Sequence, residues 1–232
     1  MNPFSLKSGL SDALPLIIGF FPISMAFGMM AKTTGVSFAD TCLFSLLVFA
    51  GASQFMALDL LKAGIATIDI ILATFLLNLR HLMMSASLSV QVQGIQKKWL
   101  PFIAFGITDE SFSVASLKKE KLSSGYLLAL QSASYVSWVV GTLTGYLIGS
   151  ALPAPVQGSL GLGLYGMFTA ILVPEIKKSS LVLCLAALSG LLYYLLAKLA
   201  LLPSGWNLIA GILLASLSGS FLLPSDAREE VK

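Results

Sequence analysis

Residues Ile70–Val92 read IILATFLLNLRHLMMSASLSVQV, an apolar stretch with Asn78, Arg80 and His81 near its centre. A helix of this length is long enough to cross a hydrocarbon core of about 30 Å. An arginine near the centre of a bilayer costs roughly 2.5–3.5 kcal/mol on insertion scales, so it is tolerated where it faces a partner or a wet cavity inside the protein. The stretch therefore predicts a membrane helix that carries a functional centre, with Arg80 as the first candidate.

The composition of the whole chain is that of a membrane protein. Of its 232 residues, 56% are apolar and only 11% are charged, and the mean hydropathy is +0.89, whereas soluble domains carry about 25% charged residues. Apolar residues come in continuous blocks instead of alternating, which argues against a membrane β-barrel. We therefore expect an all-α, polytopic bundle. Long runs without a charged residue cover Ala13–Ala31, Tyr126–Leu152, Val156–Pro174, Ser179–Ala197 and Gly205–Ser225.

We predict about seven or eight membrane helices from these runs. The segment Leu100–Leu117 is ambiguous because Thr108, Asp109 and Glu110 lie at its centre. It is either an eighth crossing or a re-entrant segment, and the Lys and Arg residues satisfy the positive-inside rule in both cases. The start of the chain lacks the pattern of a cleaved signal peptide. The other expected crossings are about 11–31, 40–61, 66–92, 126–152, 156–175, 179–200 and 205–224.

The two halves of the chain show a distant similarity. The segment FAGASQFMALDLLK (49–62) aligns with LYGMFTAILVPEIK (164–177), which matches Gly51 with Gly166. Chance similarity between two leucine-rich segments explains the match about as well as a duplication does. A true duplication would favour a secondary transporter, because repeats often meet at a binding site near the midplane. The expected boundaries are 1–232 for a single integral membrane transporter domain, with repeats at about 10–120 and 121–226.

The acidic pair Asp109–Glu110, preceded by Thr108, has two interpretations. Both carboxylates are solvated in a short interfacial loop, or one of them neutralises Arg80 or binds the ammonium group of a substrate. A buried carboxylate without such a partner would simply be protonated. A carboxylate near the midplane that gains and loses a proton is also what proton coupling requires.

Two polar neighbours of Arg80 rank below it as site residues. His81 is the only histidine of the chain and is either a hydrogen-bonded packing residue or a proton relay, the first being the commoner case. Adjacent residues of a helix point about 100° apart. Arg80, His81 and Asn78 therefore do not all point squarely at one site.

Small and polar residues interrupt the second expected span. Ser53 and Gln54 follow Gly51 and Ala52 in the run FAGASQF. Either the small residues allow close helix packing, or the helix breaks between Gly51 and Gln54 and presents Ser53, Gln54 and free backbone groups to a ligand. Broken helices line the cavities of many transporters. Gly166 and Pro174 would then make a related break in the second half.

The sequence gives little support to enzymatic or metal-binding functions. It lacks GxxxxGK[ST] and HExxH, so we expect no ATP hydrolysis by this chain, no metal site and no cofactor. Cys42 and Cys184 lie within expected spans and form no CxxC or Cys/His pattern, which supports neither a disulfide framework nor a zinc site. The basic loops set orientation in the membrane, and we assign no nucleic-acid partner to them.

Several sequence segments, taken in their order along the chain, resemble those of the AzlC/YgaZ family of branched-chain amino acid permeases. They are Pro15 with Phe27–Gly28, SLLVFAGASQF (45–55), LLNLRHLMMSASL (76–88) and TDESF (108–112). The resemblance begins near residue 10, is strongest over 45–112, and continues more loosely through GMFTAILVP (166–174). It implies an exporter of valine, leucine and isoleucine, with methionine or analogues also plausible, in the inner or cytoplasmic membrane. It also implies a small AzlD/YgaH-type partner subunit of about four spans.

The residues are compatible with such a substrate, which carries a carboxylate, an ammonium group and a short apolar tail. We expect Arg80 or a helix N-terminus near Ser53 to bind the carboxylate, and Asp109 or Glu110 to bind the ammonium group. A passive channel, or a transporter of another small polar or zwitterionic solute, is the alternative. The expected substrate-binding residues are Arg80, Asp109, Glu110, Gln54, Ser53, Asn78, His81, Thr108 and Phe168, with Phe49, Phe55, Met83 and Met84 also available for the tail.

Overall fold

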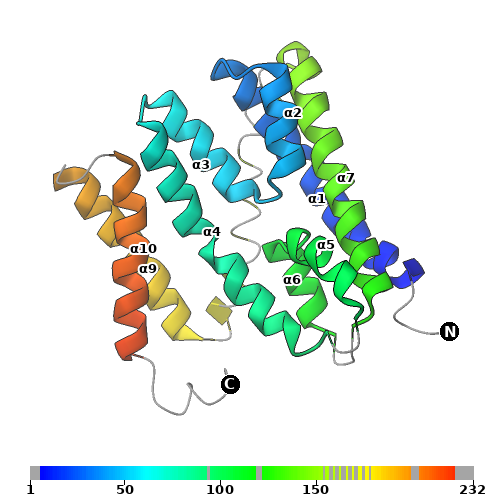
Figure 1. Ribbon diagram of the computed structural model, residues 1–232. Coiled ribbons are helices and arrows are strands. Elements are labelled where there is room, and N and C mark those ends of the chain that lie inside the picture. The colour runs from blue at the N-terminus through cyan, green and yellow to red at the C-terminus, as the bar shows by residue number, and fades with distance from the viewer. Residues whose placement is uncertain are drawn as a thin grey trace.

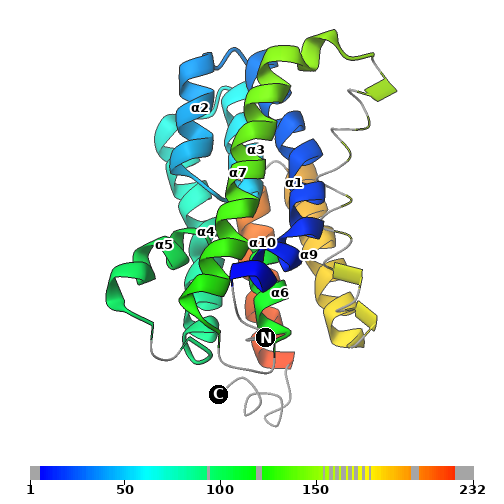
Figure 2. The same ribbon diagram turned by 90° about the vertical axis from the view of Figure 1, so that its right-hand side faces the viewer.

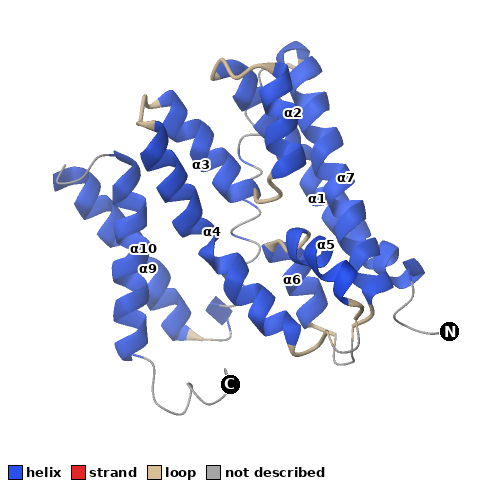
Figure 3. Ribbon diagram, viewed as in Figure 1, coloured by secondary structure: helices blue, strands red, loops and turns tan. Residues whose placement is uncertain are grey.

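The computed structural model describes residues 6–92, 95–118, 122–153, 179–199 and 204–222, together with isolated positions between 155 and 177. Every regular element in these residues is helical (Figure 1, Figure 3), as the sequence predicts. The α-helices are α1 (Leu6–Thr33), α2 (Phe38–Leu47), α3 (Gly51–Lys62), α4 (Thr67–Ser89), α5 (Leu100–Phe105), α6 (Asp109–Ser116), α7 (Ser124–Ile148), α9 (Ser180–Leu199) and α10 (Ser204–Leu222). The short 3-10 helices are η1 (Lys97–Trp99) and η2 (Gly149–Ala151).

Helices α1 and α7 pack along each other in both views (Figure 1, Figure 2), and glycines permit the close approach. A Cβ added at Gly28 of α1 would clash with the carbonyl oxygen of Thr142, and one added at Gly145 of α7 would clash with that of Met25. Small residues at membrane helix interfaces allow backbones to approach in this way. Helices α2, α3, α5 and α6 pack against this pair, and α4 packs against α3 and α6.

The second expected span, about 40–61, is divided into two helices. The alternative of one continuous helix with close packing at Gly51 is therefore wrong. Helix α2 ends at Leu47, and α3 begins at Gly51. Between them, Val48 has φ −126° and ψ 114°, and Ala50 has φ −144° and ψ 78°. The break therefore lies just before the expected stretch Gly51–Gln54, which forms the first turn of α3.

The ambiguous segment Leu100–Leu117 contains a second break. Helices α5 and α6 have 6 and 8 residues, which correspond to lengths of about 9 and 12 Å. Neither is long enough to cross a core of about 30 Å. A single membrane-crossing helix over this segment is thus excluded. The residues between the two helices, Gly106–Thr108, bring the acidic pair to the start of α6.

Three of the described helices are long and apolar enough to cross a membrane: α1, α4 and α9. This finding agrees with a polytopic membrane protein, but the number of crossings stays a prediction. Helices α9 and α10 pack together beside α4 (Figure 1). The indole Nε1 of Trp206 in α10 donates to Asp69 Oδ1 of α4 at 3.3 Å, which ties this pair to the first half.

The predicted repeats remain untested. Gly166 is helical, but Phe168, Pro174 and much of the segment 164–177 lie outside the described residues. The expected break near Gly166 therefore stays a prediction, and it is not compared with the break before Gly51.

Candidate substrate site

The predicted pairing of Arg80 with the acidic pair is confirmed by the geometry. Arg80 Nη1 of α4 lies 2.8 Å from Asp109 Oδ2 of α6, and the two side chains are 29% and 22% exposed. Among the residues that the structure describes, Arg80 Nε has no hydrogen-bond partner. The guanidinium group is therefore neutralised by Asp109 and still has a donor available for a second acceptor.

A capping box fixes the start of α6 and, with it, the acidic pair. The hydroxyl of Thr108 accepts a hydrogen bond from the backbone N–H of Ser111 at 3.2 Å. The Ser111 hydroxyl in turn accepts one from the N–H of Thr108 at 2.8 Å. This reciprocal pattern satisfies amides that a helix start leaves free. Asp109 and Glu110 occupy the first turn of α6, where the helix dipole favours negative charge.

The break before α3 presents a second helix start to the same place. Ala50 precedes α3 and supplies no side-chain cap. The first amides of a helix lack partners within the helix, and such a terminus favours anions. Gly51 allows the turn to lie against α7, because an added Cβ would be 2.6 Å from Cη2 of Trp138. A positive helix end and the Arg80 guanidinium thus border one small space.

That space is an internal cavity with a volume of about 20 Å³, which has room for about one water molecule. The polar side of its lining comes from α4 and the start of α6. The apolar side comes from α1, from α7 and from the break between α2 and α3 together with the start of α3. Its lining residues are Phe20, Phe49, Ala50, Gly51, Ala52, Arg80, His81, Thr108, Asp109, Glu110 and Trp138. An amino acid would need these side chains to move apart before it could bind.

Asn78 and Ser53 lie next to the cavity and support the broken helix. Asn78 Nδ2 of α4 donates to Ser53 Oγ at 3.0 Å, and Ser53 Oγ donates to the carbonyl oxygen of Ala50 at 2.9 Å. His81 Nδ1 lies 3.2 Å from the carbonyl oxygen of Asn78. Of these residues only His81 lines the cavity. A role of Asn78 and Ser53 in substrate binding stays a prediction.

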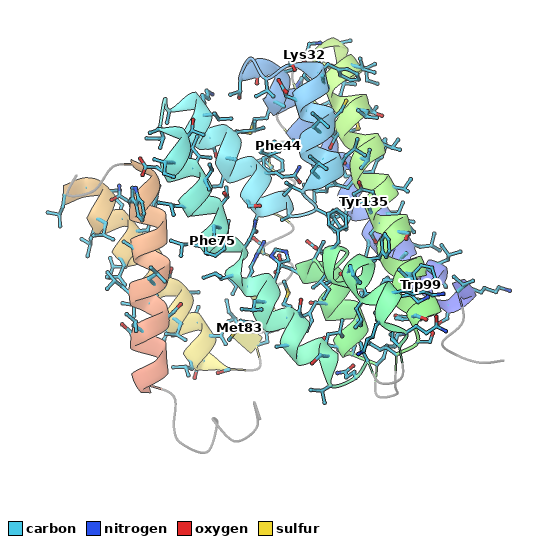
Figure 4. The ribbon with its side chains drawn as sticks, in the orientation of Figure 1. Lys32, Phe44, Phe75, Met83, Trp99 and Tyr135 are labelled. Carbon is cyan, nitrogen blue, oxygen red and sulfur yellow. The ribbon has the colours of Figure 1, made fainter. Side chains whose placement is uncertain are left out.

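Gln54 is fully buried and connects three helices. Its Nε2 donates to the carbonyl oxygen of Phe44 at 3.2 Å and lies 3.5 Å from Ser45 Oγ. The Ser45 hydroxyl is in turn 2.9 Å from Thr142 Oγ1 of α7. Tyr135 of α7, labelled in Figure 4, donates to the carbonyl oxygen of Leu46 at 2.8 Å. These bonds satisfy backbone groups at the end of α2, and Gln54 does not line the cavity.

The residues expected to contact an apolar tail divide into several groups. Phe49 lines the cavity, whereas Phe55 does not line it and is buried in the hydrophobic cluster that also contains Phe20, Phe27, Phe49 and Trp138. Met83 is 73% exposed on α4 (Figure 4), and Met84 packs against another cluster. Phe168 lies outside the described residues.

Two residues that line the cavity escaped sequence reasoning. Phe20 lies on α1 and Trp138 on α7, and both are apolar residues in ordinary membrane helices. Neither belongs to a motif or stands beside a charge. The only indirect signal was the glycine at position 51, which suggested close packing without identifying its neighbour.

Comparison with known proteins gives one family and several relatives. The profile of the family described as AzlC protein matches residues 15–152. The chain is 32% identical over 223 residues to the inner membrane protein YgaZ of Escherichia coli, covering 92% of this chain and 89% of that protein. It is 34% identical over 218 residues to an uncharacterized membrane protein of Archaeoglobus fulgidus, covering 93% of each chain.

A more distant relative has a descriptive name. The chain is 25% identical over 177 residues to the branched-chain amino acid transport protein AzlC of Bacillus subtilis, covering 75% of this chain and 69% of that protein. No solved structure matches the chain. The profile match includes all the residues that line the cavity.

Proposed function

Because this chain belongs to the AzlC family of membrane transport proteins, we propose that it is a secondary transporter that exports branched-chain amino acids across the cytoplasmic membrane. The relative in Bacillus subtilis is named for branched-chain amino acid transport. Valine, leucine and isoleucine are the proposed substrates, with methionine or analogues as further ones. A small AzlD/YgaH-type membrane subunit is the proposed partner.

The observation that carries this proposal is the ion pair Arg80–Asp109 at the internal cavity. An amino acid at neutral pH has one carboxylate and one ammonium group, as the pair has one carboxylate and one cation. The substrate carboxylate would bind Arg80 and the free amides at the start of α3. Its ammonium group would bind Asp109, and Glu110 lines the same space. The zwitterion therefore replaces the internal ion pair by two equivalent ion pairs.

This exchange offsets the cost of opening the ion pair. Separating Arg80 from Asp109 without a ligand would leave two partly buried charges unpaired, and an unpaired charge that is partly removed from water is unfavourable. Binding of a zwitterion compensates both charges at once. A solute with only one of the two charged groups would leave the other side chain unpaired, which favours amino acids over simple amines or simple carboxylic acids.

Transport would also need an energy source outside this chain. The sequence contains no phosphate-binding loop, so we propose that an ion gradient or the membrane potential drives export. Glu110 is a candidate for proton coupling because it shares the cavity with Asp109 and one arginine. Two carboxylates near a single cation favour protonation of one of them.

The test is efflux from cells or vesicles loaded with dipeptides that release valine, leucine, isoleucine or methionine. Cells that produce this chain together with its small partner should lose these amino acids faster than cells with neither protein. Cells with each protein alone show whether the partner is obligatory. Equal efflux in all cells for all four amino acids would contradict the proposal, and flux that only follows the concentration gradient would indicate a passive channel.

A further inference from the structure

Three aromatic side chains from three separate elements form the apolar side of the cavity. Phe20 of α1, Phe49 in the break and Trp138 of α7 are 3%, 5% and 1% exposed. Their ring centroids lie 5.8 Å apart for Phe20 and Phe49, 5.6 Å for Phe20 and Trp138, and 6.4 Å for Phe49 and Trp138. All three contacts have edge-to-face geometry, which aromatic rings prefer. We call these three residues the aromatic wall.

The aromatic wall stands next to the start of α3, where the substrate carboxylate is proposed to bind. The six-membered ring of Trp138 touches the position where Gly51 would carry a side chain, with Cη2 and Cζ3 at 2.6 and 3.2 Å from that point. Gly51 is the first residue of α3. The proposed carboxylate site and the wall therefore lie close together.

Charge is restricted to the opposite side of the cavity. The ionisable residues of the lining are Arg80, His81, Asp109 and Glu110, and all come from α4 and α6. A branched-chain amino acid has the same division, with two charges at one end and a compact aliphatic group at the other. Within the described part of the chain, Trp138 Nε1 has no hydrogen-bond partner, so ring packing alone holds this side chain.

We infer that the aromatic wall contacts the aliphatic side chain of the substrate and sets the largest side chain that the transporter accepts. This inference rests on the proposed function. The wall is backed by Phe27, whose ring stacks on Trp138 with centroids 6.4 Å apart and is 1% exposed. Because tightly packed side chains yield little space, the wall excludes bulkier amino acids sterically.

The experiment measures the ratio of phenylalanine efflux to valine efflux in dipeptide-loaded cells. Phe20→Leu should enlarge the apolar side of the cavity and raise this ratio about tenfold. Tenfold is the lower end of the discrimination between substrates that one methylene group gives in an apolar pocket. Phe55→Leu is the matched control, because Phe55 is buried in the same hydrophobic cluster but does not line the cavity and, among the described residues, makes its ring contact with Phe27 and not with the wall. Its ratio should equal that of the wild type.

Two further variants keep the test decisive if Phe20→Leu does not accumulate in the membrane. Phe49→Leu should raise the same ratio, and Gly51→Ala should lower valine efflux because the added methyl group displaces Trp138. Active variants with an unchanged phenylalanine-to-valine ratio, or an equal rise in Phe55→Leu, would overturn the inference while leaving valine export intact. Absence of valine efflux from the wild type would instead reject the proposed function.

Discussion

Arg80 and Asp109 each depend on the other for their place inside the protein. The sequence puts a guanidinium group in the middle of an apolar helix, where it requires an acidic partner or a cavity. The structure provides both, with an ion pair of 2.8 Å at the edge of a small cavity. A residue that only balances charge and a residue that binds substrate look alike in this geometry, so variants must separate them.

We predict that Arg80→Ala and Asp109→Asn each abolish amino acid efflux while the protein still accumulates in the membrane. The double variant should stay inactive, because the carboxylate and the ammonium group of the substrate lose their anchors together. A pair that is only structural would behave differently, since removal of the second charge would partly rescue the first change. Efflux assays with membrane immunoblots measure both properties. Wild-type efflux in both single variants would assign the ion pair to structure.

Glu110→Gln should reduce efflux less than Asp109→Asn does. Glu110 lines the cavity, but adjacent residues in a helix point about 100° apart, and only Asp109 is paired with Arg80 among the described residues. Initial efflux rates of the two variants at equal membrane abundance provide the comparison. A Glu110→Gln variant as inactive as Asp109→Asn would make Glu110 the main anchor or an essential proton carrier.

At the scale of elements, glycine decides where helices approach each other and where they start. Gly28 and Gly145 let α1 and α7 touch through their backbones, and Gly51 lets α3 begin against Trp138. Breaks before α3 and α6 then bring two helix starts to one cavity. The proposed site therefore depends on helix ends as much as on side chains.

Gly28→Ala should destabilise the protein by about 1–3 kcal/mol, because an added methyl group would overpack the interface. The clash involves the carbonyl oxygen of Thr142 and the nitrogen of Tyr146, which belong to the backbone of α7. Gly19→Ala on the same helix is the matched control, since nothing lies within 4 Å of its added Cβ. Thermal unfolding in detergent should show a lower Tm for Gly28→Ala only. Equal Tm values would mean that α1 and α7 adjust without cost.

At the scale of the whole molecule, the family and the apolar helices establish a membrane transport protein. The cavity of about 20 Å³ is too small for an amino acid, so transport requires the elements around it to move relative to one another. A transporter whose binding site opens to one side of the membrane at a time can accumulate a substrate, whereas a continuous pore can only equalise concentrations.

We therefore predict efflux of valine against its concentration gradient, and loss of this accumulation after treatment with a protonophore. The protonophore should change the rate of exchange of valine between the two sides of the membrane much less, because exchange needs no net movement of a coupling ion. The measurement uses vesicles that contain the transporter and its partner, with valine at equal starting concentrations on both sides. Failure to build a gradient in energised vesicles would favour a passive channel.

The sequence by itself determined the all-α membrane class and the need of Arg80 for a partner or a wet cavity inside the protein. Both follow from local quantities: the hydropathy of continuous segments, and the cost of a charge away from water. The same reasoning left close packing and a break in the second span as alternatives, and it placed the break at Gly51–Gln54 instead of just before Gly51. Gly51 marked the place, although its contact with Trp138 could not be read from the sequence.

Only the tertiary structure decided which Asp109 atoms meet Arg80, how the segment Leu100–Leu117 divides into two helices, and which aromatic residues line the cavity. Phe20 and Trp138 lie on separate apolar helices, and nothing in their local sequence distinguishes them from residues that face lipid. Their position depends on how α1 and α7 pack against the broken helix. Contacts between segments distant in the chain arise from packing of whole elements, which hydropathy and spacing along one segment do not encode.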